Sequence, residues 1–435
     1  MAGAGGTPKG YAAILAVVAL VLLATTGVFN PWPKVWSWVT TSGPIAEGAS
    51  QWQINLGGSP ASVALAGDAV IVEYRTRVES YGVGAGVKLW QSDADWASVA
   101  GSGGDAVVVT GKLLTKGYQV LDPRSGAVRR TDTAATAVWT YANAIVDLRC
   151  AKGDECEVTA WDPRGKDPLW TVGTGGIGFV LDAANPDLPD TRSLGSARVH
   201  DQAGGRPPMP ELLGLPDQGR IRIVDTAAGR VVHTVAPGPN QRVSVTGGRV
   251  LTVTGEARDG TCYYEVTATD PPAGTPVWRR EALNLRTADD GAACKQDRDP
   301  AGGDDVVLGV DPYGREEVVA AHDGRILWRG EKNQDVMAVN DGYVVVRSAD
   351  QDTFTGRSFR RGGRTWRRPV NAGASAALTR HAAIVATVKP SRLTALSPGG
   401  GAVLTEARTD AKVFAVGADG MIVVAGRDMA YLPFR

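Results

Sequence analysis

The sequence has no net charge, few aromatic residues and only four cysteines. Its 46 basic and 46 acidic side chains cancel, which argues against a nucleic-acid binder that relies on bulk positive charge. It also lacks the metalloprotease motif H-E-x-x-H, the nucleophile motif G-x-S-x-G and a complete phosphate-binding loop. Hydrophobic residues nevertheless make up 43% of the chain, enough for a large core, which argues against wholesale disorder.

One long apolar run is present, and it lies near the N-terminus. Residues 11–29 contain no charge and would form a helix about 28 Å long, close to the thickness of a bilayer core. Lys9 and the amino terminus place positive charge before the run, which favours a cytoplasmic N-terminus. Two prolines and three tryptophans follow within residues 31–38, as suits a membrane–water interface.

These features predict a short cytoplasmic segment (1–10), a single-pass transmembrane anchor (11–29) and a linker (30–47). Residues 48–435 would then lie outside the bacterial cytoplasmic membrane. A cleaved signal peptide is the alternative interpretation of the same apolar run.

Cysteine usage agrees with an oxidising compartment. Cys150 and Cys156 flank a predicted hairpin turn, so their side chains would face each other across two strands. Cys262 and Cys294 remain as the second pair. We predict two disulfides, because the C-x5-C spacing without a neighbouring histidine is a poor zinc signature.

The rest of the chain repeats a short glycine motif. A glycine precedes a tryptophan by four residues, or precedes another large residue at the same place, and an aspartate often opens the turn, as Asp122 does. The aspartate can accept hydrogen bonds from backbone amides two residues on, and the glycine supplies the positive φ of the turn. The members are Gly86/Trp90, Gly126/Arg130, Gly229/His233, Gly274/Trp278, Gly324/Trp328, Gly362/Trp366 and Gly400/Leu404, with Gly165/Trp170 as a shifted copy.

The spacing of this motif along the chain predicts the architecture. Most copies recur at about 40 to 50 residues, the period of four-stranded propeller blades, and apolar strand-like runs lie upstream of each turn. One gap, between Trp170 and His233, is longer and suggests a loop insertion. An isolated copy at Trp52 could pair with three C-terminal strands and close a ring, which would remove exposed strand edges.

We therefore expect an all-β fold, with one β-propeller of four-stranded antiparallel blades after the N-terminal helix. Counting terminal strands gives nine, but residues 286–305 show no clear strand. Eight blades are favoured, with seven or nine open.

The repeat resembles the PQQ-like (pyrroloquinoline-quinone-type) β-propeller family, most clearly at Asp122-Pro-Arg-Ser-Gly126 and from Asp162 to Trp170. The resemblance covers roughly residues 48–435. It implies an eight-bladed propeller, and a function either as a quinone-dependent dehydrogenase or as a scaffold of cell-envelope assembly that binds no cofactor.

The resemblance also implies tests for a dehydrogenase. Such enzymes hold the quinone on calcium, and many place a disulfide of two adjacent cysteines against it, whereas no cysteines are adjacent here. We therefore expect no cofactor, with PQQ or calcium as the alternatives, and assign no catalytic residue. The repeat tryptophans are interpreted as packing residues between blades: Trp90, Trp170, Trp278, Trp328 and Trp366.

Two charge clusters stand out. Six arginines crowd one hairpin, where period-two alternation should divide them between the two faces as solvated side chains, or where they form a patch for an anionic ligand. Six aspartates fall in the strandless stretch, either as a solvated loop or as calcium ligands. The clusters are Arg357, Arg360, Arg361, Arg364, Arg367 and Arg368, and Asp289, Asp290, Asp297, Asp299, Asp304 and Asp305.

The sequence thus favours a membrane-anchored extracytoplasmic propeller that acts as a binding or scaffolding module, more readily a non-enzyme than an enzyme. Its partner would be an envelope protein or a glycan. A PQQ-dependent dehydrogenase and a carbohydrate-active propeller acting on cell-wall glycans remain the alternatives.

Overall fold

Several of the repeat turns are held by their aspartate, as expected. Oδ1 of Asp162 accepts hydrogen bonds from the backbone amides of Arg164 and Gly165 at 2.9 and 2.8 Å, and Asp225 does the same in its own turn. A short polar side chain thereby satisfies turn amides that have no strand partner. Successive strands can then pair as antiparallel neighbours.

The computed structural model describes residues 45–46, 48–151, 155–174, 198–286, 294, 301–360 and 362–435. Within these ranges the only helix is the short η1 (Gly103–Asp105), and no helix is long and apolar enough to cross a membrane. The predicted anchor at 11–29 and residues 1–10 lie outside the described residues, as does the linker except for residues 45–46.

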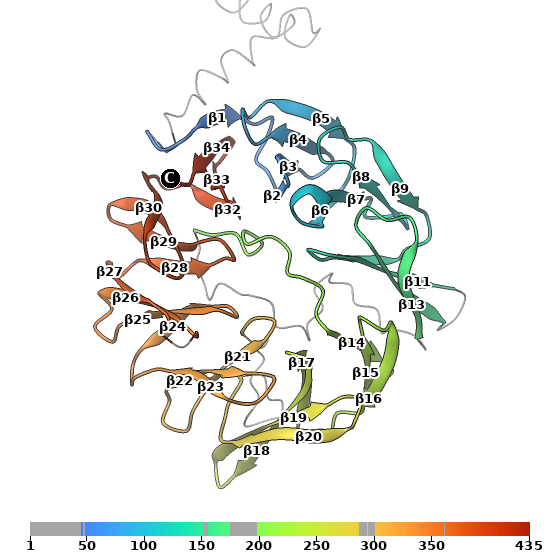
Figure 1. Cartoon of the computed structure of the whole chain (residues 1–435), viewed down its shortest axis with the longest axis vertical. Coiled ribbons are helices and arrows are strands. Elements are labelled where there is room, and N and C mark those ends of the chain that lie inside the picture. The colour runs from blue at the N-terminus through green and yellow to red at the C-terminus, as the bar shows by residue number, and fades with distance from the viewer. Residues whose placement is uncertain are drawn as a thin grey trace, which may run out of the picture. The chain divides into compact units, whose positions relative to one another are not determined.

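The described strands form nine antiparallel sheets, which we number as blades 1–9 in chain order (Figure 1). Blade 1 contains β2 (Ser62–Ala66), β3 (Ala69–Glu73), β4 (Val78–Gly82) and β5 (Lys88–Ser92), and blade 2 contains β6 (Trp96–Ala100), β7 (Val107–Gly111), β8 (Tyr118–Leu121) and β9 (Val128–Asp132). Blade 3 contains β10 (Ala137–Thr140), β11 (Ile145–Cys150), β12 (Cys156–Trp161) and β13 (Pro168–Thr174), and blade 4 contains β14 (Leu212–Asp217), β15 (Arg220–Asp225) and β16 (Arg230–Val235). Blade 5 contains β17 (Gln241–Thr246), β18 (Arg249–Arg258), β19 (Thr261–Asp270) and β20 (Thr275–Glu281).

The second half of the chain forms the other four blades. Blade 6 contains β21 (Val306–Val310), β22 (Glu316–Ala320) and β23 (Ile326–Arg329), and blade 7 contains β24 (Asp335–Val339), β25 (Tyr343–Arg347), β26 (Thr353–Ser358) and β27 (Thr365–Pro369). Blade 8 contains β28 (Ser375–Leu378), β29 (Ala383–Val388), β30 (Ser391–Leu396) and β31 (Val403–Arg408). Blade 9 contains β32 (Lys412–Val416), β33 (Gly420–Ala425) and β34 (Asp428–Pro433), together with β1 (Trp52–Asn55).

The ring closes through blade 9, which combines both ends of the propeller. β1 pairs antiparallel with β34, from Trp52 opposite Tyr431 to Asn55 opposite Asp428. The N-terminal strand thus completes a sheet whose other three strands are C-terminal, as expected from the isolated copy at Trp52. Because the ring is closed, blade 1 and blade 9 each have a neighbouring blade on both sides.

The preference for eight blades is wrong, because the sheets number nine over the described part of the chain. The stretch without a clear strand belongs to blade 6. Asn284 pairs with Val310 and Gly302 pairs with Val307, so the innermost strand of this blade survives as two short bridges. The two bridging residues are 18 positions apart in the sequence, which is why alternation could not reveal this strand.

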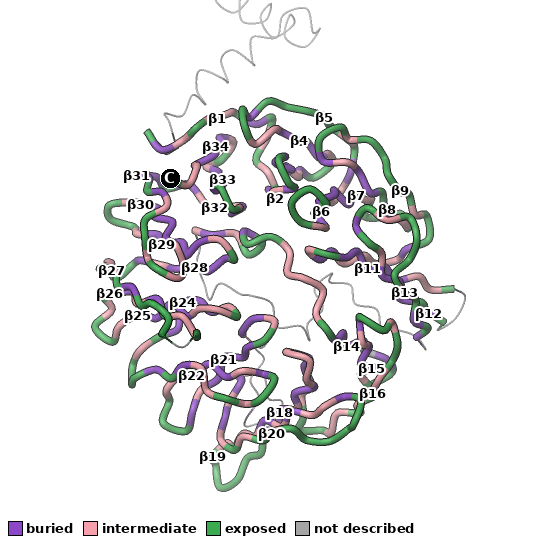
Figure 2. Tube along the Cα trace, viewed as in Figure 1, coloured by how far each residue is buried: buried purple, intermediate pink, exposed green. Residues whose placement is uncertain are grey.

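The core is divided among the interfaces between blades. Nine clusters of buried hydrophobic residues lie one between each pair of neighbouring sheets, and Figure 2 shows buried stretches in every blade. Ile223 of blade 4, for example, packs with Val243 and Val250 of blade 5. Each blade is therefore stabilised from both sides, which an open row of sheets could not achieve.

The repeat tryptophans pack between blades, as predicted, and they explain the glycines. A Cβ on Gly126 would lie 2.9 Å from the ring of Trp90 in the preceding blade, and one on Gly229 would lie 2.2 Å from Cβ of Trp170. Both glycines also have positive φ. In blade 8 the corresponding residue is Gly401, which has positive φ and contacts Trp366, and not Gly400 as the spacing suggested.

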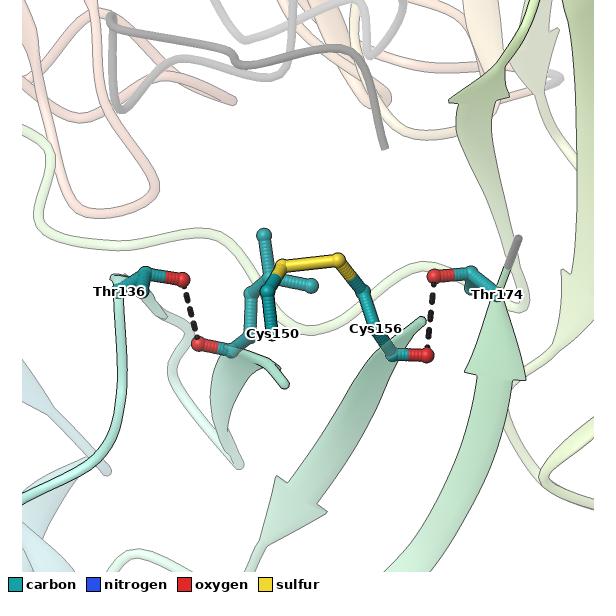
Figure 3. Close-up of a disulfide and its surroundings, with 5 residues drawn as sticks. Thr136, Cys150, Cys156 and Thr174 are labelled. Carbon is teal, nitrogen blue, oxygen red and sulfur yellow. Dashed lines mark hydrogen bonds between the residues drawn. A yellow bond between two sulfur atoms is a disulfide. The ribbon is translucent and has the colours of Figure 1, made fainter. Parts of the chain in front are cut away.

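Both predicted disulfides are present. Cys150 lies directly opposite Cys156 on β11 and β12, and Oγ1 of Thr174 donates to the Cys156 carbonyl at 3.2 Å (Figure 3). Cys262 on β19 bonds to Cys294, which ties the interruption of blade 6 to blade 5. The second bridge therefore holds an insertion that has few other described partners in the ladder.

Replacing Cys262 and Cys294 together with serine should lower the free energy of unfolding by about 3–4 kcal/mol. The same double change at Cys150 and Cys156 should cost only about 2 kcal/mol, because its closed loop is far shorter. The sequence separations are 32 and 6 residues. Urea unfolding of both variants tests this order, and a larger loss at Cys150/Cys156 would contradict a chain-entropy origin.

Candidate functional site

A segment of the chain crosses the middle of the ring, and we call residues 198–211 the strap. In Figure 1 it runs from beside β32 across the centre to β14. Val199 forms a parallel bridge with Val413 of β32. The strap belongs to the long insertion between Trp170 and His233, whose preceding part at 175–197 lies outside the described residues.

Arg198 fixes the beginning of the strap. Its guanidinium donates to the carbonyls of Thr409 and Ala411 at 2.8 and 3.0 Å, and to Oγ of Ser391 at 3.0 Å. Two main-chain bonds to Val413 continue the attachment along the strand. A half-buried cation held by oriented carbonyls needs no carboxylate nearby to be solvated.

The far end of the strap is attached to the opposite side of the ring. Arg206 donates to Oγ of Ser98 on β6 at 2.8 Å, and the amide of Ala142 donates to the Pro207 carbonyl at 2.7 Å. The amide of Met209 donates to Oδ1 of Asn143 at 2.7 Å. The strap therefore links blade 9 to blades 2 and 3 and occupies the central space with the chain's own residues.

A cavity of about 250 Å³ lies between the strap and the turns of blades 6, 7 and 8. Its lining comprises strap residues 199–208, Asp304, residues 340–343 and residues 377–380. Burial lowers the pKa of His200, the positive charge of Lys412 adds to the effect, and Asp201 opposes it, so the imidazole is neutral near pH 7. Its ring stacks on Phe414, with centroids 5.0 Å apart.

This cavity contains donors and acceptors that mostly satisfy one another. Oδ1 of Asn340 accepts from the amides of Gly342 and Tyr343, and Oδ1 of Asp341 accepts from Asp305 at 2.7 Å. In the portion of the chain that is described, no three His, Cys, Asp or Glu side chains are grouped to hold a metal ion. The arrangement suits ordered water or a small polar group.

The predicted aspartate cluster is only partly placed. Asp304 and Asp305 lie in the turn beside the cavity, where the Asp304 carbonyl accepts from the amide of Gly247 at 2.8 Å. The other members lie outside the described residues: Asp289, Asp290, Asp297 and Asp299. A calcium site built from this loop stays a prediction.

The arginine hairpin is formed by β26 and β27 of blade 7, and alternation divides it as expected. Arg368 points to one face and pairs with Glu406 of blade 8 at 2.6 Å. Arg367 points to the other face, opposite Thr355, and Arg357 lies on that same face opposite Thr365. Arg361 lies outside the described residues.

Four of these arginines form an exposed group, which we call the arginine hairpin patch. Each side chain is exposed, and none makes an ion pair with the residues that the structure describes. Glu406 on the neighbouring blade is shared by Arg368 and Arg392. The patch consists of Arg357, Arg360, Arg364 and Arg367.

A buried carboxylate, that of Glu79, is neutralised by side chains of its own blade, and the sequence analysis did not identify it. Glu79 is 3% exposed and receives hydrogen bonds from Lys88 at 2.7 Å, Arg77 at 3.0 Å and the Tyr81 hydroxyl at 2.6 Å. Burial alone would raise its pKa, but these three donors outweigh it and lower the pKa to about 2. Nothing in the local pattern marks this glutamate as buried.

Glu79 should make stability depend on pH in the acid range. Because its pKa is depressed in the fold, its contribution is present above about pH 4.5 and is lost as the pH falls towards 2. We expect this carboxylate to account for about 3 kcal/mol of that loss. Urea unfolding between about pH 4.5 and 2 should show that the free energy of unfolding falls less steeply with pH in Glu79→Gln than in the unchanged protein. Identical slopes in the two proteins would contradict the assignment.

The fold defines a β-propeller protein with an internally strapped centre. Residues 264–428 match the family model described as outer membrane protein assembly factor BamB. Over residues 264–428 this match confirms the resemblance to the PQQ-like β-propeller family that was drawn from the repeats. No curated protein sequence matches it.

The chain is also similar in fold to solved structures. BamB from Moraxella catarrhalis is 15% identical, with 88% of this chain and 99% of that chain covered and a TM-score of 0.38. The quinohemoprotein alcohol dehydrogenase ADHIIG from Pseudomonas putida HK5 is 13% identical, with 87% and 72% covered and a TM-score of 0.38. Likenesses this distant carry no argument about function.

Proposed function

We propose that this protein is a binding or scaffolding module of the cell envelope, held to the bacterial cytoplasmic membrane by residues 11–29 with its propeller outside. The arginine hairpin patch is the observation that carries the proposal. Four exposed guanidinium groups lie on one outer hairpin without a carboxylate partner among the described residues. Guanidinium groups bind carboxylates in a bidentate geometry, so the partner would be an acidic envelope protein.

Two further features support this proposal. The strap occupies the centre of the ring, so the surfaces offered to a partner are the outer hairpins and the turns. The two disulfides suit an oxidising compartment outside the cytoplasm. A scaffold also agrees with the family description, which names an assembly factor.

Changing the four patch arginines to glutamate should abolish recovery of the acidic partner from solubilised membranes. The change reverses eight units of charge at one site, and like charges across an interface cost affinity and slow association. The experiment is affinity purification of the full-length protein, with quantitative mass spectrometry and a thermal melt to verify folding. We expect at least a tenfold loss of the partner.

The matched control changes four exposed arginines on other blades to glutamate: Arg124, Arg164, Arg220 and Arg325. It alters net charge by the same amount but leaves the patch intact, so the partner should be retained. Equal losses in both variants would show a nonspecific charge effect. Unchanged recovery with the patch reversed would contradict the proposed site.

A further inference from the structure

The hairpin turn between β7 and β8 of blade 2 carries two of the most exposed apolar side chains in the described residues. Leu114 is 98% exposed and Leu113 is 74% exposed. Lys112 precedes them and Lys116 follows after Thr115; both lysines are exposed, and Nζ of Lys112 lies 3.9 Å from Oδ1 of Asp95 at the surface. Two leucines at a turn, with no protein surface covering them, form an amphipathic tip with a cation on each side.

The tip is held in place from both ends. The amide of Leu113 donates to Oδ2 of Asp95 at 3.1 Å, and the amide of Asp95 donates to the Gly111 carbonyl at 2.9 Å. At the other end, Gly117 has a φ of +95°, and a Cβ there would lie 2.2 Å from the Asp132 carbonyl oxygen. These contacts position the leucines outward and prevent them from folding back onto the blade.

Other exposed apolar residues lie on the same face of the ring. In every blade, the turn between the second and third strands points to this face, because neighbouring strands are antiparallel. Tyr313 in the blade 6 turn is 76% exposed, and Val388 at the blade 8 turn is 50% exposed and precedes the exposed Lys389. The blade 7 turn is acidic instead, with Asp350 and Asp352, so the face is not uniformly cationic.

The leucines and lysines of the blade 2 tip indicate what kind of surface could cover it. Leucines enter the apolar layer below lipid headgroups, while lysines beside them remain at the level of the headgroups and are attracted by anionic lipids. A hairpin tip with this order of residues is complementary to a lipid surface, and it presents no concave wall for an extended peptide.

We propose that the blade 2 tip, Lys112–Lys116, inserts into the headgroup region of an anionic bilayer. Its leucines enter the apolar layer and its lysines contact lipid phosphates. This contact is separate from the anchor at 11–29 and from the arginine hairpin patch, and it would orient the propeller on a membrane. The chain enters the ring on the opposite face, where Nε1 of Trp52 donates to the Val83 carbonyl in the turn after β4.

The test uses the full-length protein with Thr115→Cys labelled by bimane. Thr115 is exposed beside both leucines, and the native cysteines are all in disulfides, so labelling is specific. The protein is reconstituted into phosphatidylcholine vesicles with or without phosphatidylglycerol. Nitroxide-labelled lipid is placed either in the same vesicles or in added protein-free vesicles, which distinguishes the anchoring membrane from a second one.

We expect nitroxide lipid to quench bimane at residue 115 severalfold more with phosphatidylglycerol than without it, in one of the two arms. The changes Leu113→Ser with Leu114→Ser, and Lys112→Gln with Lys116→Gln, should each abolish this quenching. Bimane at Gln119→Cys, exposed on β8 of the same blade, should stay accessible to an aqueous quencher.

Two results would overturn the proposal. In the first, residue 115 remains fully accessible to the aqueous quencher and unaffected by nitroxide lipid in both arms. In the second, residue 115 is protected equally in all vesicles, with no dependence on phosphatidylglycerol or on nitroxide lipid, which would indicate contact with protein. Thermal melts matching the unchanged protein exclude misfolding as the cause.

Discussion

Deletion of residues 45–56 is expected to open the ring and lower the free energy of unfolding by more than about 5 kcal/mol. The deletion removes β1, and with it the buried side chains of Leu56, Ile45 and Ala46. It also removes the stacking of Trp52 on Tyr431, whose ring centroids lie 5.9 Å apart. β1 pairs with a strand at the other end of the propeller, since Asn55 and Asp428 are 373 residues apart in the sequence.

Loss of β1 should also change the oligomeric state. β34 would become the exposed edge of blade 9, and an unpaired edge strand pairs readily with other chains. Thermal unfolding and size-exclusion chromatography with light scattering of the full-length and deleted proteins test both effects. Trp52→Phe serves as the mild control, because it keeps the strand. A deleted protein that stays monomeric with an unchanged melting temperature would contradict closure by β1.

Replacement of Phe354 by alanine is expected to cost about 3–5 kcal/mol of unfolding free energy. Phe354 is fully buried in blade 7, where it packs with Trp366 and Leu378 in the cluster shared with blade 8. The Arg347 guanidinium lies 5.2 Å from its ring centroid and donates to the Ala374 carbonyl at 2.7 Å. Truncation would therefore leave a cavity beside a buried cation.

Urea unfolding with Phe354→Ala and Phe354→Leu measures this effect. Leucine keeps most of the apolar volume, so its loss should be clearly smaller. An alanine variant within about 1 kcal/mol of the unchanged protein would contradict tight packing at the interface between blades 7 and 8.

The fold could be predicted from the sequence because its signals are local and repeated. The aspartate and glycine of each turn act within a few residues, and the tryptophan recurs at a fixed distance, as at Trp90 and Trp278. The predicted number of blades was wrong because one strand of blade 6 does not show a local, repeated pattern. The innermost strand of blade 6 pairs at Asn284 and again at Gly302, and no periodic pattern survives such an interruption.

The candidate site was less predictable, for a physical reason. The strap has no periodicity, and its partners lie far away in sequence: Arg198 binds Ala411, and Arg206 binds Ser98. The division of the arginines between two faces was predictable, because strand alternation alone separates Arg367 from Arg368. That Glu406 would neutralise Arg368 and leave the other face unpaired depends on the packing of blade 8 against blade 7.

The most direct test of the proposed function is photo-crosslinking from the arginine hairpin patch in living cells. A photoreactive amino acid replaces Thr365, which is exposed and lies opposite Arg357. Leu169, exposed on β13 of blade 3, is the control position. We expect one dominant crosslinked acidic envelope protein at position 365, lost when the four patch arginines are glutamate and absent at position 169. No crosslinked product at 365, or one that persists after charge reversal, would contradict it.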